Sequence, residues 1–114
     1  MNYIIHTPSA TRLKKEIFES VSAGADASHK DIATWQCTET DSSEHVLVYS
    51  SGQWVDKGFI VLNHNISHNE LQVRFHYWDS WKDRNNDDDK VMLGRFTELI
   101  LVHFSYFIDK ITIE

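Results

Sequence analysis

Residues 71–78, with the sequence LQVRFHYW, alternate between apolar and polar side chains along most of their length. This alternation predicts a β-strand with one buried face, because successive side chains of a strand point to opposite faces of its sheet. The stretch therefore indicates that the fold is built around a sheet. The residues that we expect on its buried face are Leu71, Val73, Phe75 and Tyr77.

The neighbouring stretches extend this sheet. Residues 59–62 (FIVL) form a continuous apolar run, which is typical of a central strand that is covered on both faces. Only the turn-rich segment 63–69 separates this run from residues 71–78. A link this short predicts antiparallel neighbours, because parallel strands need a long crossover. Further strands are predicted for residues 2–6, 33–38, 45–49 and 110–113.

Two helices accompany the strands. Thr7 and Pro8 are suited to the start of a helix, and the apolar spacing that follows predicts an amphipathic helix over residues 8–23. Residues 88–108 predict a long, strongly apolar helix, which we expect to be buried on most of its surface. Together these elements predict an α+β fold in one domain, residues 1–114. In it, an antiparallel sheet of about four to six strands packs against the N-terminal amphipathic helix and the long apolar C-terminal helix.

The composition favours a cytoplasmic protein. With 114 residues the chain has the size of one domain. Its single cysteine, Cys37, excludes an internal disulfide, and the first residues lack the pattern of a signal peptide. We interpret Cys37 as a small buried side chain of a strand and not as a nucleophile.

The charge narrows the classes of partner. The chain has 17 acidic and 11 basic residues, a formal net charge of −6. Nucleic-acid binders present a basic face, whereas the basic residues are scattered here, so we expect no direct binding of nucleic acid. An acidic chain suits a basic protein partner, although solubility alone also explains the charge. Because Arg95, Glu98 and His103 interrupt the long apolar helix, we expect no membrane association.

The motifs of catalysis and metal binding are missing or incomplete. His64 and His68 have the spacing that joins two imidazoles on a helix, but they lie in a link between predicted strands. Within residues 79–89, Asp83, Asn85 and Asp87 occupy alternate positions as in a calcium loop, but the central glycine and the closing glutamate of such a loop are missing. Since no glycine-rich phosphate loop is present either, we expect no metal, no cofactor and no catalytic residues.

The strongest candidate for a binding surface is the loop that follows residue 77. It contains two tryptophans beside a series of aspartates, and large aromatic side chains with a charged rim are typical of binding hot spots. In the alternative interpretation, the tryptophans fold under the loop and the aspartates cap the next helix. The candidate partner-binding residues are Trp78, Asp79, Trp81, Asp83, Asp87, Asp88 and Asp89.

In its size, acidic charge and lack of catalytic motifs, the chain resembles the small bacterial immunity proteins that neutralise toxin domains. The resemblance covers no motif and implies no particular residue. It implies a non-enzymatic inhibitor, monomeric or weakly dimeric, that binds a basic partner such as a toxin nuclease domain. The alternative is a small-ligand-binding or enzymatic domain with a pocket between sheet and helix, in which His76, Arg74 and Tyr77 supply polar groups. A third interpretation is a homodimer joined through apolar surface of the last helix.

Overall fold

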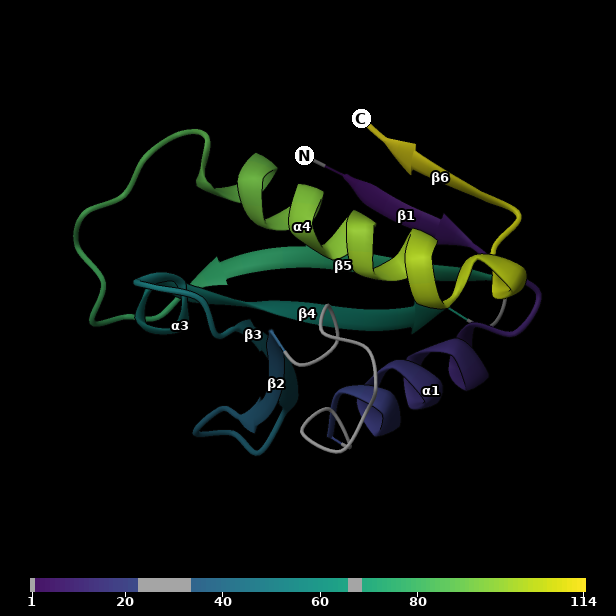
Figure 1. Cartoon of the computed structure of the whole chain (residues 1–114), viewed down its shortest axis with the longest axis horizontal. Helices are drawn as coiled ribbons and strands as arrows, with labels where there is room; N and C mark the ends of the chain where they lie inside the picture. The colour runs from purple at the N-terminus through teal and green to yellow at the C-terminus, as the bar shows by residue number, and fades with distance from the viewer. Residues whose placement is uncertain (1, 23–33, 66–68) are drawn as a thin grey trace.

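A computed structural model describes residues 2–22, 34–65 and 69–114 of the chain (Figure 1). Residues 23, 33 and 68, which belong to the predicted segments above, lie outside this part. The elements are β1 (Tyr3–His6), α1 (Ala10–Ser22), β2 (Trp35–Glu39), β3 (His45–Tyr49), α3 (Trp54–Lys57), β4 (Gly58–Asn65), β5 (Glu70–Tyr77), α4 (Asp88–His103), the 3-10 turn η3 (Ser105–Phe107) and β6 (Lys110–Ile113).

The strands form a six-stranded sheet with the order β2-β3-β4-β5-β1-β6, and all neighbours are antiparallel. The predicted α+β class and the antiparallel sheet are therefore confirmed. The hairpins β2–β3 and β4–β5 join strands that follow each other in the chain. In contrast, β1 lies between β5 and β6, which come much later in the sequence. Figure 1 shows the β2–β3 hairpin running at a steep angle to the long strands β4 and β5.

The alternation of β5 sets the register of the central strands. Ile60 pairs with Phe75 and Leu62 pairs with Val73, so that the apolar side chains of both strands share one face. Leu71 and Val73 are fully buried, as the alternation predicts. Phe75 is half-buried and packs against the core. The continuous run of β4 is explained as well, because Val61, on the opposite face, is also buried.

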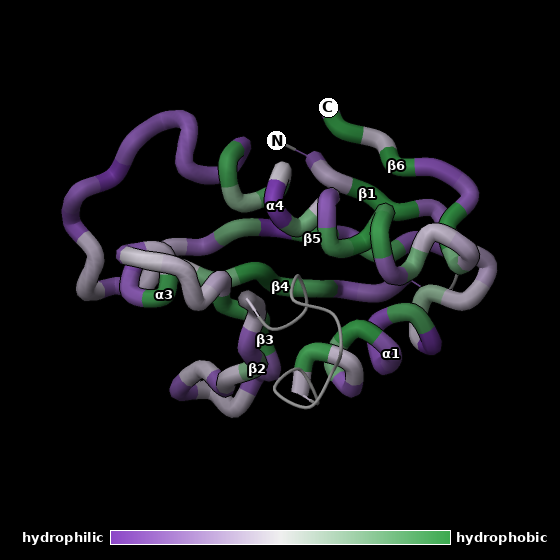
Figure 2. The backbone as a smooth tube through the Cα atoms, viewed as in Figure 1, coloured by the Kyte–Doolittle hydropathy of each residue, from purple (hydrophilic) through white to green (hydrophobic). Residues whose placement is uncertain are grey.

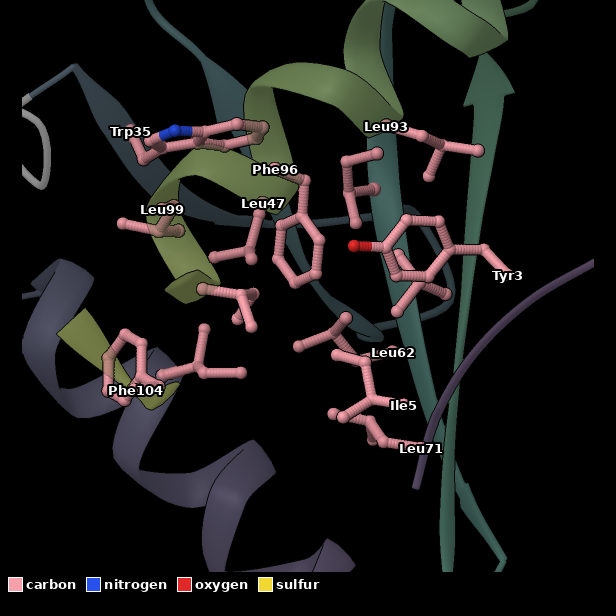
Figure 3. Packing of buried hydrophobic residues seen from close by; sticks show 14 of the residues in the cluster. Tyr3, Ile5, Trp35, Leu47, Leu62, Leu71, Leu93, Phe96, Leu99 and Phe104 are labelled. Atoms are coloured by element: carbon pink, nitrogen blue, oxygen red, sulfur yellow. The ribbon is translucent and has the colours of Figure 1, made fainter. Parts of the chain in front are cut away.

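Both long helices cover the same face of the sheet. Helix α1 buries a stripe formed by Ala10, Leu13, Ile17 and Val21. Helix α4 buries Met92, Leu93, Phe96, Leu99 and Ile100 in the same apolar cluster. Figure 3 shows Phe96 at the centre of this cluster, between Trp35 and Tyr3. The Phe96 ring makes edge-on contacts with Trp35 and Tyr3, at centroid distances of 6.0 Å and 6.2 Å.

The expectation that α4 is buried on most of its surface is wrong. The helix ends at His103, and η3 follows it. Leu101 and Val102 are 54% and 61% exposed, and Val91 is 43% exposed. A helix that lies on one face of a sheet buries only one stripe, so the additional apolar residues of this sequence face outward. Figure 2 shows hydrophobic and hydrophilic residues alternating along α4.

The opposite face of the sheet has its own cover at one end. There the Trp78 ring lies 4.4 Å from the Phe59 ring, centroid to centroid, and α3 lies beside it. Val48 and Val61 are buried on this face. In the described residues, we find no helix with the length and apolarity needed to cross a membrane.

Candidate functional site

Two of the candidate residues, Trp78 and Trp81, line one hollow of about 570 Å³. The hollow lies between the β2–β3 hairpin, α3 and the segment that leaves β5. Its floor and walls combine aliphatic, aromatic and polar side chains, with one carboxylate. The residues that line it are Gln36, Cys37, Thr38, Val48, Val55, Asp56, Trp78, Ser80 and Trp81.

The backbone of α3 fixes Trp78 in this hollow. The Trp78 N–H donates to the Lys57 carbonyl at 3.1 Å, which continues the pairing of β5 past its last residue. The indole Nε1 donates to the Val55 carbonyl at 3.2 Å. Because both donors and the ring are held, the half-buried indole presents a preformed apolar wall.

Trp81 is held by a tight turn. Its N–H donates to the Trp78 carbonyl at 3.0 Å, and its Nε1 donates to the Asp83 carbonyl at 2.7 Å. The ring is half-buried and faces the Lys57 ammonium at 5.6 Å. Both tryptophans therefore pack against the fold with one side, as expected if they fold under the loop. With the other side they line the hollow.

A buried ion pair anchors the loop behind the hollow. The Lys57 Nζ donates to the Asp88 Oδ1 at 3.0 Å, and each side chain is only 7% exposed. The same ammonium lies 4.4 Å from the centroid of the Trp54 ring. Tyr77 donates its hydroxyl to the Asp88 Oδ2 at 2.7 Å, and the Asn85 N–H donates to the same oxygen at 2.9 Å.

These contacts set the protonation states of Asp88 and Tyr77. Burial by itself raises the pKa of Asp88, but hydrogen bonds from Tyr77, from the Asn85 N–H and from Lys57 outweigh it, so the pKa lies below its usual value. Burial, together with the hydrogen bond to the Asp88 carboxylate and its charge, raises the pKa of Tyr77 to about 12. Asp88 is therefore ionised and Tyr77 neutral at physiological pH.

The structure separates the predicted aspartates into two groups. Asp79, Asp83 and Asp87 are exposed, and Asp89 is half-buried. Asp88 is buried and points inward, so its carboxylate is occupied by the fold and does not face a partner. The expected capping of the helix is seen in a different form. Asp87 occupies the N-cap position without a side-chain cap, and the Asp88 carboxylate holds the preceding turn instead.

The cations of the loop are engaged within the loop. Lys82 donates to the Asp79 carbonyl at 3.1 Å, and Arg84 donates to the Trp81 carbonyl at 3.1 Å. Among the described residues, neither the Asp79 nor the Asp83 carboxylate has an ion-pair partner. The loop from Asp79 to Asp87 contains three aspartates and two cations, so it keeps a net negative charge beside the hollow.

Asp56 is the site residue that the sequence analysis missed. It lies in α3, lines the hollow and is exposed. Within the described part of the chain, its carboxylate makes no ion pair. The available signal was the sequence Trp54-Val55-Asp56-Lys57 directly after the turn at Gly52, which sets an acidic residue between an aromatic and a basic one.

The residues proposed for a pocket between sheet and helix do not meet in one. Arg74 and His76 lie on the sheet face opposite to the helices, whereas Tyr77 points to the helix side and binds Asp88. A hollow of about 810 Å³ lies between α1 and the β2–β3 hairpin. It is lined by Lys14, Phe18, Glu19, Ser22, Cys37, Ser43, Glu44 and His45.

The remaining candidates for chemistry are placed apart. Burial raises the pKa of the Cys37 thiol, although a hydrogen bond with Ser22 lowers it, so the thiol stays protonated at neutral pH. His64 is exposed near the end of β4, and His68 lies outside the described residues. In residues 2–22, 34–65 and 69–114, no group of three or more potential ligands is placed to hold a metal ion.

Comparison of the chain with protein-family models, with curated proteins and with solved structures found no match.

Proposed function

We propose that the chain is a non-enzymatic protein-binding module, an acidic inhibitor of the immunity type, which binds a basic protein partner in the cytoplasm. A toxin nuclease domain is the kind of partner that fits, because its phosphate-binding cleft is basic. In this proposal a lysine or arginine side chain of the partner enters the hollow between Trp78 and Trp81. The exposed aspartates of the adjacent loop face the basic surface around it.

The observation that carries the proposal is the meeting, in one hollow, of two indole rings with the carboxylate of Asp56, which makes no ion pair within the described part of the chain. Aromatic faces attract ammonium and guanidinium groups, and Trp is the strongest of them. The fold already uses this attraction at the back of the same cluster, where Lys57 lies over Trp54 and faces Trp81. A second cation on the open side would contact Trp78 and Trp81 and pair with Asp56.

The geometry also suits a specific interface. Trp78 and Trp81 are immobilised by their hydrogen bonds before any partner arrives, so little side-chain entropy is lost on binding. Rigid aromatic side chains within a polar rim are typical anchors of protein interfaces. Arginine is the side-chain cation that most often lies over an aromatic ring.

The test is the capture of a partner from the native lysate by four tagged proteins. They are the wild type, Asp56→Lys, Asp79→Lys, and Asp41→Lys as the matched control. Asp41 is exposed in the turn between β2 and β3, so its reversal changes the net charge equally without touching the hollow. We expect the wild type and Asp41→Lys to retain the same basic protein in stoichiometric amount. Both variants at the hollow should bind it at least about tenfold more weakly.

Two results would contradict the proposal. If all four proteins retain the partner equally, the hollow is not the interface. If no protein is retained at low salt, the chain is not a binding module of this kind. Thermal unfolding of each variant shows whether a loss of binding reflects a loss of fold.

A second candidate function, the binding of a small molecule, is favoured by the hollow between α1 and the β2–β3 hairpin. Its volume of about 810 Å³ is in the range of ligand pockets, and its lining includes Phe18, Cys37 and His45. The His45 ring packs against Phe18 at 6.3 Å, centroid to centroid, and its Nε2 lies 3.6 Å from the Glu39 Oε1. This candidate predicts that a small ligand raises the midpoint of thermal unfolding of the wild type, and that a Phe18→Ala variant loses the effect.

A further inference from the structure

Strand β6 leaves one edge of the sheet without a partner among the described residues. On its other side it pairs with β1, where Asn2 and Glu114 exchange two backbone hydrogen bonds of 2.8 Å and 2.9 Å. Hydrogen-bonded and non-hydrogen-bonded pairs alternate along an antiparallel ladder. Thr112, opposite Ile4, therefore directs its backbone groups to β1. Ile111 and Ile113 direct their N–H and C=O groups outward, to the free edge.

The sequence of this edge is complementary to itself. If two copies of residues 110–114 (KITIE) run antiparallel with Thr112 opposite Thr112, each Ile111 faces Ile113 of the other copy. In the same register, each Lys110 faces Glu114 of the other copy. Because the backbone groups of Ile111 and Ile113 point outward, these two residues can exchange hydrogen bonds across the edge in this register. Hydrogen bonding and charge therefore select the same register.

We propose that the chain forms a homodimer through β6, with a twofold axis at Thr112 and one continuous sheet across both copies. A free strand edge is a template for pairing with another chain, and Ile113, which is 54% exposed, becomes covered when Ile111 of the second copy lies beside it. Each dimer contains two Lys110–Glu114 pairs, because a twofold interface repeats every contact. This interface is distinct from the hollow at Trp78.

The adjacent side of α4 is compatible with this approach. Thr97 meets the hydroxyl of Tyr3 on β1, and Figure 1 shows β1 and β6 along this side of the helix. Gly94 and Leu101 lie on the same stripe, three residues before and four residues after Thr97. No atom lies within 4 Å of a Cβ built at Gly94, and Leu101 is 54% exposed. Gly94 and Leu101 thus lie on the stripe of α4 that meets β1, and both are exposed.

The other edge of the sheet, β2, lacks this complementarity. Its outward backbone groups belong to residues 35, 37 and 39, because Ser50 donates to the Thr34 carbonyl on the paired side. Pairing of β2 with its own copy around Cys37 would place Trp35 opposite Glu39, without a charge pair. The two edges are therefore not equivalent, and β6 is the one that fits a second copy.

A charge swap tests the proposal by sedimentation velocity over a range of concentrations. The wild type should show a reversible monomer–dimer equilibrium. Lys110→Glu and Glu114→Lys each turn two attractions into repulsions, so we expect each to dissociate at least about tenfold more readily. The double variant Lys110→Glu/Glu114→Lys should dimerise like the wild type. An equimolar mixture of the two single variants should form a mixed dimer, while Lys82→Glu, a matched charge reversal away from the edge, should change nothing.

A crosslink gives a second readout that does not depend on charge. In a Cys37→Ser background, Thr112→Cys places two thiols at the twofold axis in a non-hydrogen-bonded pair, and oxidation should join them. Lys110→Cys is the control, because two copies of residue 110 lie at opposite ends of the paired strands. The proposal is overturned if the wild type is monomeric at every concentration, if the double variant fails to restore dimers, or if both cysteine variants crosslink equally.

Discussion

Asp88 is the residue of the loop whose charge the fold itself requires. Its partner Lys57 is 7% exposed, so removal of the carboxylate leaves a buried ammonium without a counter-charge. Such a loss costs about 3–5 kcal/mol in the free energy of unfolding. We expect an Asp88→Asn variant to be destabilised by this amount in urea denaturation. Asp87→Asn, an exposed neighbour at the same end of α4, should change the free energy by less than about 0.5 kcal/mol.

The same variant has a second readout in acid. The unfolded chain protonates this carboxylate near its ordinary pKa of about 3.9, and the folded chain protonates it at lower pH. The stability that ionised Asp88 contributes is therefore complete above about pH 4 and is lost as the pH falls through the folded-state pKa. The difference between wild type and Asp88→Asn should shrink in this range. A difference that stays constant down to pH 2 would mean that the carboxylate does not stabilise the fold by its charge.

At the level of the site residues, the large aromatics beside a strand end singled out Trp78 and Trp81, and both line one hollow. Their binding of a partner stays a prediction. The three consecutive aspartates, residues 87–89, give no signal for which carboxylate turns inward. That choice is made by Lys57, which is distant in the sequence and meets Asp88 only in the folded chain.

Two glycines in regular elements have opposite roles, and the difference is measurable. A Cβ at Gly58, the first residue of β4, would clash with the His76 carbonyl oxygen and lie 2.5 Å from the Phe75 ring. At Gly94, within α4, nothing lies within 4 Å. We expect Gly58→Ala to lower the midpoint of thermal unfolding, because the backbone carbonyl of the paired strand must move.

Gly94→Ala should raise the midpoint, since alanine is favoured over glycine by about 1 kcal/mol in a helix. Both variants are compared with the wild type at one low concentration, at which the proposed dimer dissociates. Equal effects of the two substitutions would contradict the close packing of β4 against β5 at Gly58.

The elements were predicted to different degrees, and their length explains why. Each predicted strand carries enough alternating or β-branched residues to be recognised, and all six are present. Helix α3 was missed, because four residues are too few to show a helical period. The burial of α4 was overestimated, because a continuous apolar run does not reveal how many faces of a helix find a partner. The position of β1 between β5 and β6 is decided by contacts across the whole chain, which no local pattern contains.

For the whole molecule, the net charge of −6 has a kinetic consequence for the proposed partner binding. Long-range attraction between an acidic and a basic protein accelerates their encounter and is screened by salt. Once the captured partner is purified, the association rate constant should fall at least about tenfold from low to high salt, whereas the dissociation rate constant should change only about twofold. Stopped-flow tryptophan fluorescence measures both. A salt effect confined to dissociation would indicate that short-range contacts alone hold the complex.

The place of β1 also orders the events of folding. The hairpins β2–β3 and β4–β5 close from neighbouring residues, whereas β1 has to wait for two strands that are synthesised long after it. Contacts between such distant segments require the closure of large loops, which slows their formation. On the ribosome, residues 3–6 therefore remain unpaired until β5 and β6 have been synthesised. The side chains of Tyr3 and Ile5, which are fully buried in the folded chain, stay accessible to a chaperone during this interval.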